Sequence, residues 1–169
     1  MNPNTGQVVW STYFGAENTI LSGVSVYGDD LFVSGIFSNS SNSSTSFQRF
    51  VTTGVHKSQP YSTNPQNPLA DRDDAFLAKI NSNSGSIIWS TRFGGINFST
   101  PNNLSEYDAA RGNLTNDLTV DVHGNPIITG TTNSREIGTT PGAYIDKLST
   151  NNTINQTYVA KFNNSDGKL

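Results

Sequence analysis

The residues that could bind a metal ion or cleave a glycoside in this chain are acidic side chains in turns. Asp71, Asp73 and Asp74 form the densest acidic group, and carboxylates are the ligands that Ca²⁺ prefers. Two carboxylates facing each other could instead act as acid and base in glycoside hydrolysis. However, the chain lacks the D-x-[DN]-x-[DN]-G pattern of a Ca²⁺ loop, and turn acids often accept backbone N–H bonds. We therefore predict solvated turn acids and no cofactor, with these three residues as the candidate Ca²⁺ site.

The histidines and serines lack the partners that catalysis needs. His56 and His123 fall at a loop or turn, with no Cys or second His near either of them in the sequence. A zinc site or a Ser-His-Asp triad requires such groups to converge. The G-x-S-x-G nucleophile elbow and the Gly-rich phosphate-binding motifs are also missing. The sequence therefore predicts no catalytic residue and a non-enzymatic role.

Composition argues against several kinds of partner. The 169 residues carry a net charge of −3 without a basic run, which argues against nucleic acid and anionic membranes. No apolar stretch approaches the ~18 residues that cross a bilayer, so no membrane span is expected. Cysteine is absent, which excludes disulfides but not an oxidising compartment.

Asn-x-Ser/Thr sequons are frequent, mostly in polar stretches that look like loops. Such sequons accept N-linked glycans in secreted and surface proteins, although a chain rich in Asn, Ser and Thr also forms them by chance. The interpretation as a surface glycoprotein and the chance interpretation both remain open at this point. The candidates are Asn39, Asn42, Asn97, Asn103, Asn113, Asn151 and Asn155, with Asn163 a weaker site at a strand end.

The elements that carry these residues belong to an internal repeat. NTGQVVWSTYFG (4–15) matches NSGSIIWSTRFG (83–94), and GVSVYGDDLFVSG (23–35) matches LTVDVHGNPIITG (118–130). TTGVH (52–56) then matches TTPGAY (139–144), and AFLAKINSNSG (75–85) matches TYVAKFNNSDG (157–167). Self-similarity of this kind is the signature of a repeat architecture. We place the first unit at 1–72, the second at 73–156, and the start of a further repeat at 157–169.

Each unit is predicted to supply four strands and no helix. In the second unit they are 75–81, 86–93, 117–122 and 126–132, and the short turn 81–85 makes the first two a hairpin. We expect an all-β fold of antiparallel four-stranded propeller-blade repeats, with two blades. An eight-stranded, two-sheet sandwich is the alternative. The repeated Trp10 and Trp89 should be buried between neighbouring blades, whereas Tyr13 and Arg92 should point to a more solvated face.

The motif order resembles the bacterial seven-bladed beta-propeller repeat family. WSTYFG, AFLAK, TVDVHGNPIITG and TTPGAY are similar to the family's YSTYLGG strand, DAFVAKL strand, AVDSSGNVYVTG hairpin and TTPGA tail. The chain departs from the family at 16–23 and 106–112, where the acidic turn is blurred. Its loops at 36–72, 95–113 and 133–155 are also longer. The resemblance implies a scaffold at an extracellular or cell-surface location rather than a reaction.

Two blades are too few to close a propeller, which takes about 4–8. We therefore expect the strand 157–163 to complete a blade in another copy or in the next part of a longer chain, giving a ring or a filament. Its assembly residues are Tyr158, Val159, Ala160, Lys161 and Phe162. The expected function is a structural or adhesive surface module that packs against copies of itself or flanking domains. The alternative is a carbohydrate-binding or carbohydrate-active propeller domain, with glycans as partners.

Overall fold

The computed structural model describes residues 4–15, 19–38, 51–56, 73–94, 114–132, 137–145 and 156–169. These parts contain seven β-strands and no helix, so the all-β prediction is confirmed. None of them holds a helix of the kind that crosses a membrane. The strands are β1 (Thr19–Tyr27), β2 (Asp30–Ser38), β3 (Asp73–Asn81), β4 (Ile87–Phe93), β5 (Leu114–Val120), β6 (Pro126–Thr132) and β7 (Gln156–Lys161).

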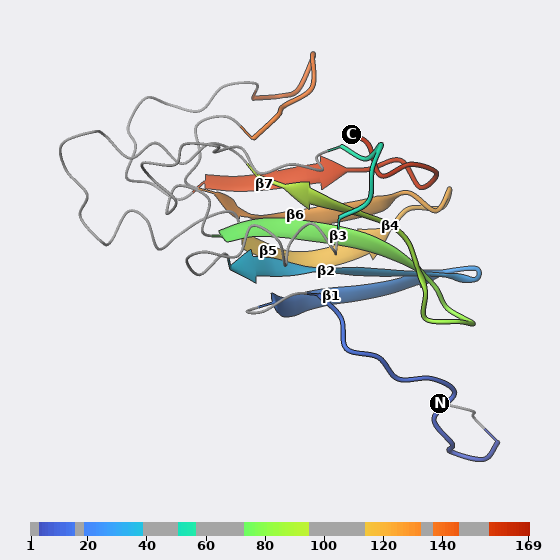
Figure 1. Cartoon of the computed structure of the whole chain (residues 1–169). Helices are drawn as coiled ribbons and strands as arrows, with labels where there is room; N and C mark the ends of the chain where they lie inside the picture. Colours follow the sequence, from blue (N-terminus) through green and yellow to red (C-terminus); the bar gives the residue numbers. More distant parts are fainter. Residues whose placement is uncertain are drawn as a thin grey trace.

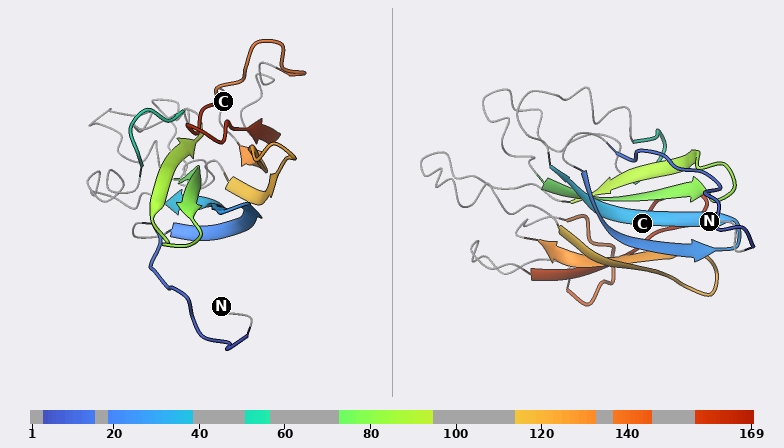
Figure 2. Two further views of the ribbon diagram at one scale, coloured as in Figure 1. Left: turned by 90° about the vertical axis from the view of Figure 1, so that its right-hand side faces the viewer. Right: turned by 90° about the horizontal axis from the view of Figure 1, so that it is seen from below.

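The strands form two antiparallel sheets that lie face to face (Figures 1 and 2). Sheet A has the order β1-β2-β3-β4 and sheet B the order β5-β6-β7. The tight turns that follow β1, β3, β5 and β7 lie at one end of both sheets (Figure 1). The β1–β2 turn is tight because Tyr27 pairs with Asp30, and Gly28 adopts a φ of 58° there, which glycine tolerates without a steric cost.

The grouping of the strands differs from the prediction of two four-stranded units. The four strands predicted for the second unit are divided, because β3 and β4 belong to sheet A whereas β5 and β6 belong to sheet B. Each sheet thus pairs the last two strands of one sequence unit with the first strands of the next unit, which are β3 and β4 in sheet A and β7 in sheet B. Sheet B has three strands in the described part of the chain. Residues 7–14, which the repeat matches to the predicted strand 86–93, are not a strand in the described structure.

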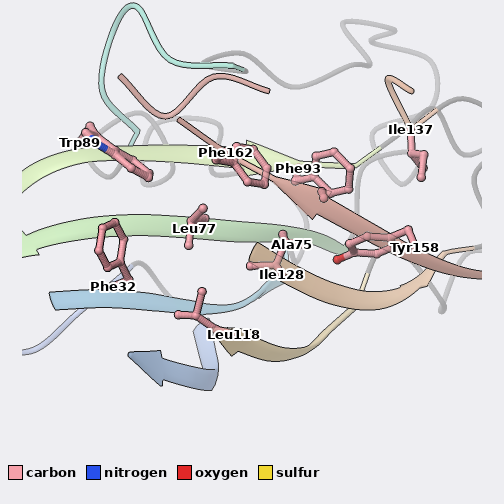
Figure 3. Close-up of a cluster of buried hydrophobic side chains, with 11 residues drawn as sticks. Phe32, Ala75, Leu77, Trp89, Phe93, Leu118, Ile128, Ile137, Tyr158 and Phe162 are labelled. Atoms are coloured by element: carbon pink, nitrogen blue, oxygen red, sulfur yellow. The ribbon is translucent and has the colours of Figure 1, made fainter. Parts of the chain in front are cut away.

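The main core lies between the two sheets. Side chains from both sheets point into this space (Figure 3), and Phe93 of β4 lies 5.0 Å from the Tyr158 ring and 5.6 Å from the Phe162 ring, centroid to centroid. Sheets bury one face each in this way because removal of apolar surface from water drives folding. The buried members are Phe32, Ala75, Leu77, Trp89, Phe93, Leu118, Ile128, Ile137, Tyr158, Ala160 and Phe162.

Candidate interaction surfaces

The two sequence copies give each strand of sheet A a counterpart. Alignment of 75–85 with 157–167 makes β7 the counterpart of β3, and the strand pairing agrees, since Phe76 lies opposite Gly35 and Tyr158 opposite Gly130. In the same way β6 corresponds to β2, and residues 8–14 correspond to β4. β5 corresponds to β1 by strand pairing: Leu118 opposite Ile128 takes the place of Val24 opposite Val33, one residue away from the sequence match of Leu118 with Gly23. The register of β1–β2 and of β5–β6 also shifts at matching places. We call residues at matching places equivalent.

Sheet A carries a second apolar cluster on the face that points away from sheet B, here called the outer face of sheet A. Phe14 packs on it from outside the sheet, with its ring centroid 5.9 Å from that of Phe76. This face is equivalent to the face of sheet B that sheet A buries, since Phe76, Ala78 and Ile80 correspond to Tyr158, Ala160 and Phe162. The buried members of the cluster are Val33, Phe37, Phe76, Ala78 and Ile80.

Strand β1 is exposed on this outer face, whereas its equivalent β5 is covered by sheet A. Val24 lies opposite Val33 in the ladder and is 67% exposed. Its equivalent Leu118 lies opposite Ile128 and is 6% exposed, because sheet A covers it. The same side of β1 also exposes Val26. Within the described residues, β1 therefore lacks on this face the cover that sheet A provides to β5.

Sheet B also has an outer face, the one that points away from sheet A. Residues on it are exposed, although their equivalents in sheet A are buried. Val159 is 75% exposed there, whereas its equivalent Leu77 is fully buried between the sheets. Ile127 and Thr129 on the same face are partly exposed, and they correspond to the buried Phe32 and Ser34. Sheet B therefore exposes the face that sheet A buries against it, and sheet A exposes the β1 part of the face that sheet B buries. The two outer faces together are equivalent to the interior contact.

The N-terminal segment (residues 4–15) lies against sheet A in the way that β4 lies against sheet B. Trp10 Nε1 donates a hydrogen bond to Ser82 O at 2.6 Å, and Trp89 Nε1 donates to the equivalent Asn164 O at 2.9 Å. Phe14 packs on Phe76 just as β4's Phe93 packs on Tyr158. The prediction of buried Trp side chains is confirmed for Trp89, while Trp10 is half-buried.

A glycine makes room for each indole ring. A Cβ at Gly85 would lie 3.0 Å from the Trp10 ring, and one at Gly167 would lie 2.8 Å from the Trp89 ring. Both glycines have a positive φ, 74° and 66°, in the turn that follows the equivalent strands β3 and β7. Glycine satisfies both demands at once, the open backbone conformation and the close approach of a ring.

Residues 51–56 cover the free edge of β4. Thr52 N donates to Ser90 O at 3.0 Å, and Ser90 N donates to Thr52 Oγ1 at 3.1 Å. The His56 ring packs near Phe93 and Phe162 at centroid distances of 5.9 and 6.0 Å. The repeat places Tyr144 at the position of His56, and Tyr144 is fully exposed. His56 is thus part of an aromatic contact between the sheets, and His123 is exposed in the β5–β6 turn.

Arg92 contradicts the prediction that it faces solvent. It is 1% exposed and forms an ion pair with the equally buried Asp74 of the neighbouring strand. A long basic side chain can be buried here, on the outer face of sheet A, because Asp74 supplies the opposite charge. This pair also engages one of the three candidate Ca²⁺ ligands. Asp71 and the side chain of Asp73 lie outside the described residues, and no group of three potential metal ligands occurs within them.

The predicted modification sites and the assembly strand have different outcomes. Asn39, Asn42, Asn97, Asn103, Asn113, Asn151 and Asn155 all lie outside the described residues. Asn163 is exposed in the turn after β7, where its Oδ1 accepts a hydrogen bond from Ser165 N at 2.8 Å. The predicted assembly residues 158–161 lie in β7, which pairs with β6 of its own chain. Completion of a neighbouring blade by this strand stays a prediction.

In each sheet, a lysine of the third strand forms an ion pair with an aspartate at the turn between the first two strands. Lys161 Nζ lies 2.6 Å from Asp121 Oδ2, and the equivalent Lys79 Nζ lies 2.8 Å from Asp30 Oδ2. Asp121 Oδ1 also accepts hydrogen bonds from the backbone N–H groups of His123 and Asn125, both at 2.8 Å. The Lys161 ammonium first, and then these amides, hold the pKa of Asp121 well below its ordinary value. The Asp121 carboxylate therefore holds the backbone of the β5–β6 turn and links this turn to β7 through Lys161.

We expect the stability of the chain to fall as acid protonates Asp121. Because the folded-state pKa lies below that of the unfolded chain, this carboxylate stabilises the fold above the ordinary Asp value, and the contribution is lost as the pH falls below it. Asp121→Asn should therefore be less stable than the natural chain at neutral pH, with a difference that shrinks at about pH 3. Urea unfolding at both pH values measures this, and Lys161→Met should reduce the same pH dependence. If the stability difference between Asp121→Asn and the natural chain were the same at both pH values, the prediction would be wrong.

Comparison with known proteins does not assign the chain to a family. No protein-family model matches it, and no curated protein matches it. The resemblance to propeller repeats therefore stays a prediction that rests on the motifs themselves. The sequence analysis missed the exposed valines of β1 and the equivalence of the two outer faces. The signal was the alternation in GVSVY at 23–27, which is typical of a strand with one apolar face.

Proposed function

We propose that this protein is a structural repeat module whose sheets are consecutive blades of a propeller-like array and which assembles with other copies of itself. The carrying observation is that the outer faces of sheets A and B are equivalent to the two faces that pack together inside the chain. Docking the outer face of sheet B on the outer face of sheet A repeats a contact that this sequence already forms.

This contact is head to tail because the two faces differ. Residues such as Val159 lie on one outer face, whereas Val24 and Phe76 lie on the other. A contact between unlike surfaces leaves one unused face at each end, so assembly continues until the rotation closes a ring or a filament grows. Both outcomes suit a scaffold, and neither requires an active site.

The proposed location is extracellular or at the cell surface, in an adhesive or filamentous assembly. The support comes from the sequence, namely the low charge content of 14%, the abundant Asn, Ser and Thr, and the sequons in long polar stretches. Glycans on those Asn residues would fit a surface position. The same surface would be soluble without strong repulsion between copies, since the net charge is only −3.

Val24→Asp tests the proposal, because it places a charge on the exposed part of the proposed contact. We expect at least a tenfold loss of association constant, since an unpaired carboxylate would be buried between copies. Sedimentation at several concentrations measures it. Val122→Asp is the matched control, because Val122 is also exposed but lies in the β5–β6 turn. Equal association by both variants and the natural chain would contradict the proposed face, provided that unfolding curves show both variants folded.

A further inference from the structure

We propose that the N-terminal segment of one copy is the fourth strand of sheet B in a second copy, added beside β7. This inference rests on the proposed function and names the contact that joins the copies. β3 is flanked by β2 and by β4, whereas its equivalent β7 pairs with β6 alone among the described residues. A strand edge with unpaired backbone groups captures an extended segment readily.

The segment has the sequence that this position requires. β4 has the sequence IIWSTRF, and residues 8–14 have VVWSTYF, so the alternation and the β-branched residues are retained. In sheet A, Leu77 lies opposite Thr91 and Lys79 opposite Trp89. The equivalent register places Val159 opposite Thr12 and Lys161 opposite Trp10. Val8, Val9 and Tyr13, which are exposed in the chain, would then lie in a sheet.

The position of the segment points to a second copy rather than to sheet B of the same chain. Its contacts with Ser82 and Phe76 hold it on sheet A, on the side that faces away from sheet B (Figure 2). When sheet B of a second copy docks on that side, its β7 comes to lie beside the segment, as β3 lies beside β4. Face packing and strand addition are therefore satisfied by one arrangement.

Two side chains match the segment to sheet B and not to sheet A. In sheet A, Arg92 of β4 pairs with Asp74, and both side chains are buried on the outer face of the sheet. The equivalents are Tyr13 in the segment and Gln156 in β7, which are both neutral and can form hydrogen bonds. Placing β4 beside β7 would bury Arg92 without its carboxylate, and placing the segment beside β3 would bury Asp74 without its cation. Both errors are costly, so each strand fits its own sheet.

The 139–144 stretch is placed to cover the added strand. Its equivalent, residues 52–56, covers the free edge of β4 through Thr52 and His56. Gly54 and Gly142 have nearly the same φ, 81° and 83°, so the local backbone is alike. Tyr144, the equivalent of His56, is fully exposed in the chain and would pack on Phe14 of the added segment.

Engineered cysteines test the register directly, because the chain has none of its own. Full-length Val159→Cys, carrying a size tag, is mixed with Thr12→Cys under mild oxidation. Residues opposite each other on paired strands are close enough for a disulfide. We expect at least about tenfold more mixed dimer than with Tyr13→Cys, whose side chain would face the other side of the sheet. Equal yields, or no mixed dimer, would overturn the strand addition.

Charged substitutions at Tyr13 and Gln156 provide a second test of the strand addition. Tyr13→Arg should lower the association constant about 100-fold, because the guanidinium would be buried beside Gln156, while the isolated chain stays folded since Tyr13 is fully exposed. Adding Gln156→Asp should restore association. Lack of rescue would overturn the proposed pairing of these positions.

The outcomes separate this inference from the proposed function. If Val24→Asp weakens association but Thr12→Cys does not cross-link to Val159→Cys, the packed faces stand and the strand addition is wrong. If a chain with both cysteines forms only an intramolecular disulfide, the segment completes sheet B of its own chain, and a second copy is the wrong occupant. If the natural chain does not associate at all, the proposed function itself fails.

Discussion

Arg92→Met is expected to destabilise the folded chain by about 3–5 kcal/mol, because it leaves the buried Asp74 carboxylate without its counter-charge. Both side chains of this ion pair are almost completely buried, so water cannot replace the missing partner. Asp74→Leu should cost a similar amount for the converse reason, since it strands the guanidinium. Urea unfolding, followed by Trp fluorescence, measures both values.

The double variant Asp74→Leu with Arg92→Met is the informative control. A buried ion pair that is replaced as a whole by apolar side chains of similar volume often leaves stability unchanged or higher. We therefore expect the double variant to recover most of the loss seen in either single variant. If the double variant is as unstable as the sum of the two single variants, the pair is not the coupled unit that the structure shows.

Gly130→Ala is the second substitution with a large expected effect, about 3 kcal/mol or more. An added Cβ would lie 1.8 Å from Leu114 O and 2.6 Å from Tyr158 Oη. Tyr158 Oη donates a hydrogen bond to that same carbonyl at 3.0 Å, so neither group can withdraw without breaking a buried contact. Burial raises the pKa of this phenol to about 12, which keeps its donor proton in place at any pH near neutrality.

Gly142→Ala is the matched control for this glycine. Gly142 has a φ of 83° but nothing within 4 Å of an added Cβ, so its substitution costs only backbone strain of roughly 1–2 kcal/mol. Gly35→Ala should behave like Gly130→Ala, because its Cβ would lie 2.0 Å from Ile20 O and 2.7 Å from the Phe76 ring. A Gly130→Ala chain as stable as Gly142→Ala would show that the aromatic ring does not lie over this glycine.

The sequence could predict the hairpins and the repeated aromatic residues because these depend on local pattern. The strand pairs 75–81 with 86–93 and 117–122 with 126–132 were predicted with small errors at their ends. The sheet to which a hairpin belongs could not be predicted, because a repeat has no natural starting point. The pairing of β2 with β3 joins the two sequence units across a long connection, and its sequence carries no signal for that choice.

Arg92 and Val24 show why the candidate surfaces were missed. The burial of Arg92 depends on Asp74, and the repeat replaces this pair by Tyr13 and Gln156, so comparison of the copies suggested a variable, solvated position. Val24 and its equivalent Leu118 are both apolar, yet only Leu118 has a sheet packed on it. The exposure of these two residues depends on whether another sheet packs on their strand, and the strand's own sequence does not encode that.

The particle mass of the intact chain tests the central claim most directly, namely that the outer faces of the two sheets pack on each other between copies. Sedimentation over a wide concentration range measures it without any substitution. We predict a mass that is a multiple of 18.2 kDa, either rising with concentration as a filament does or fixed at the value of a closed ring. A single species of 18.2 kDa at every concentration would contradict the account.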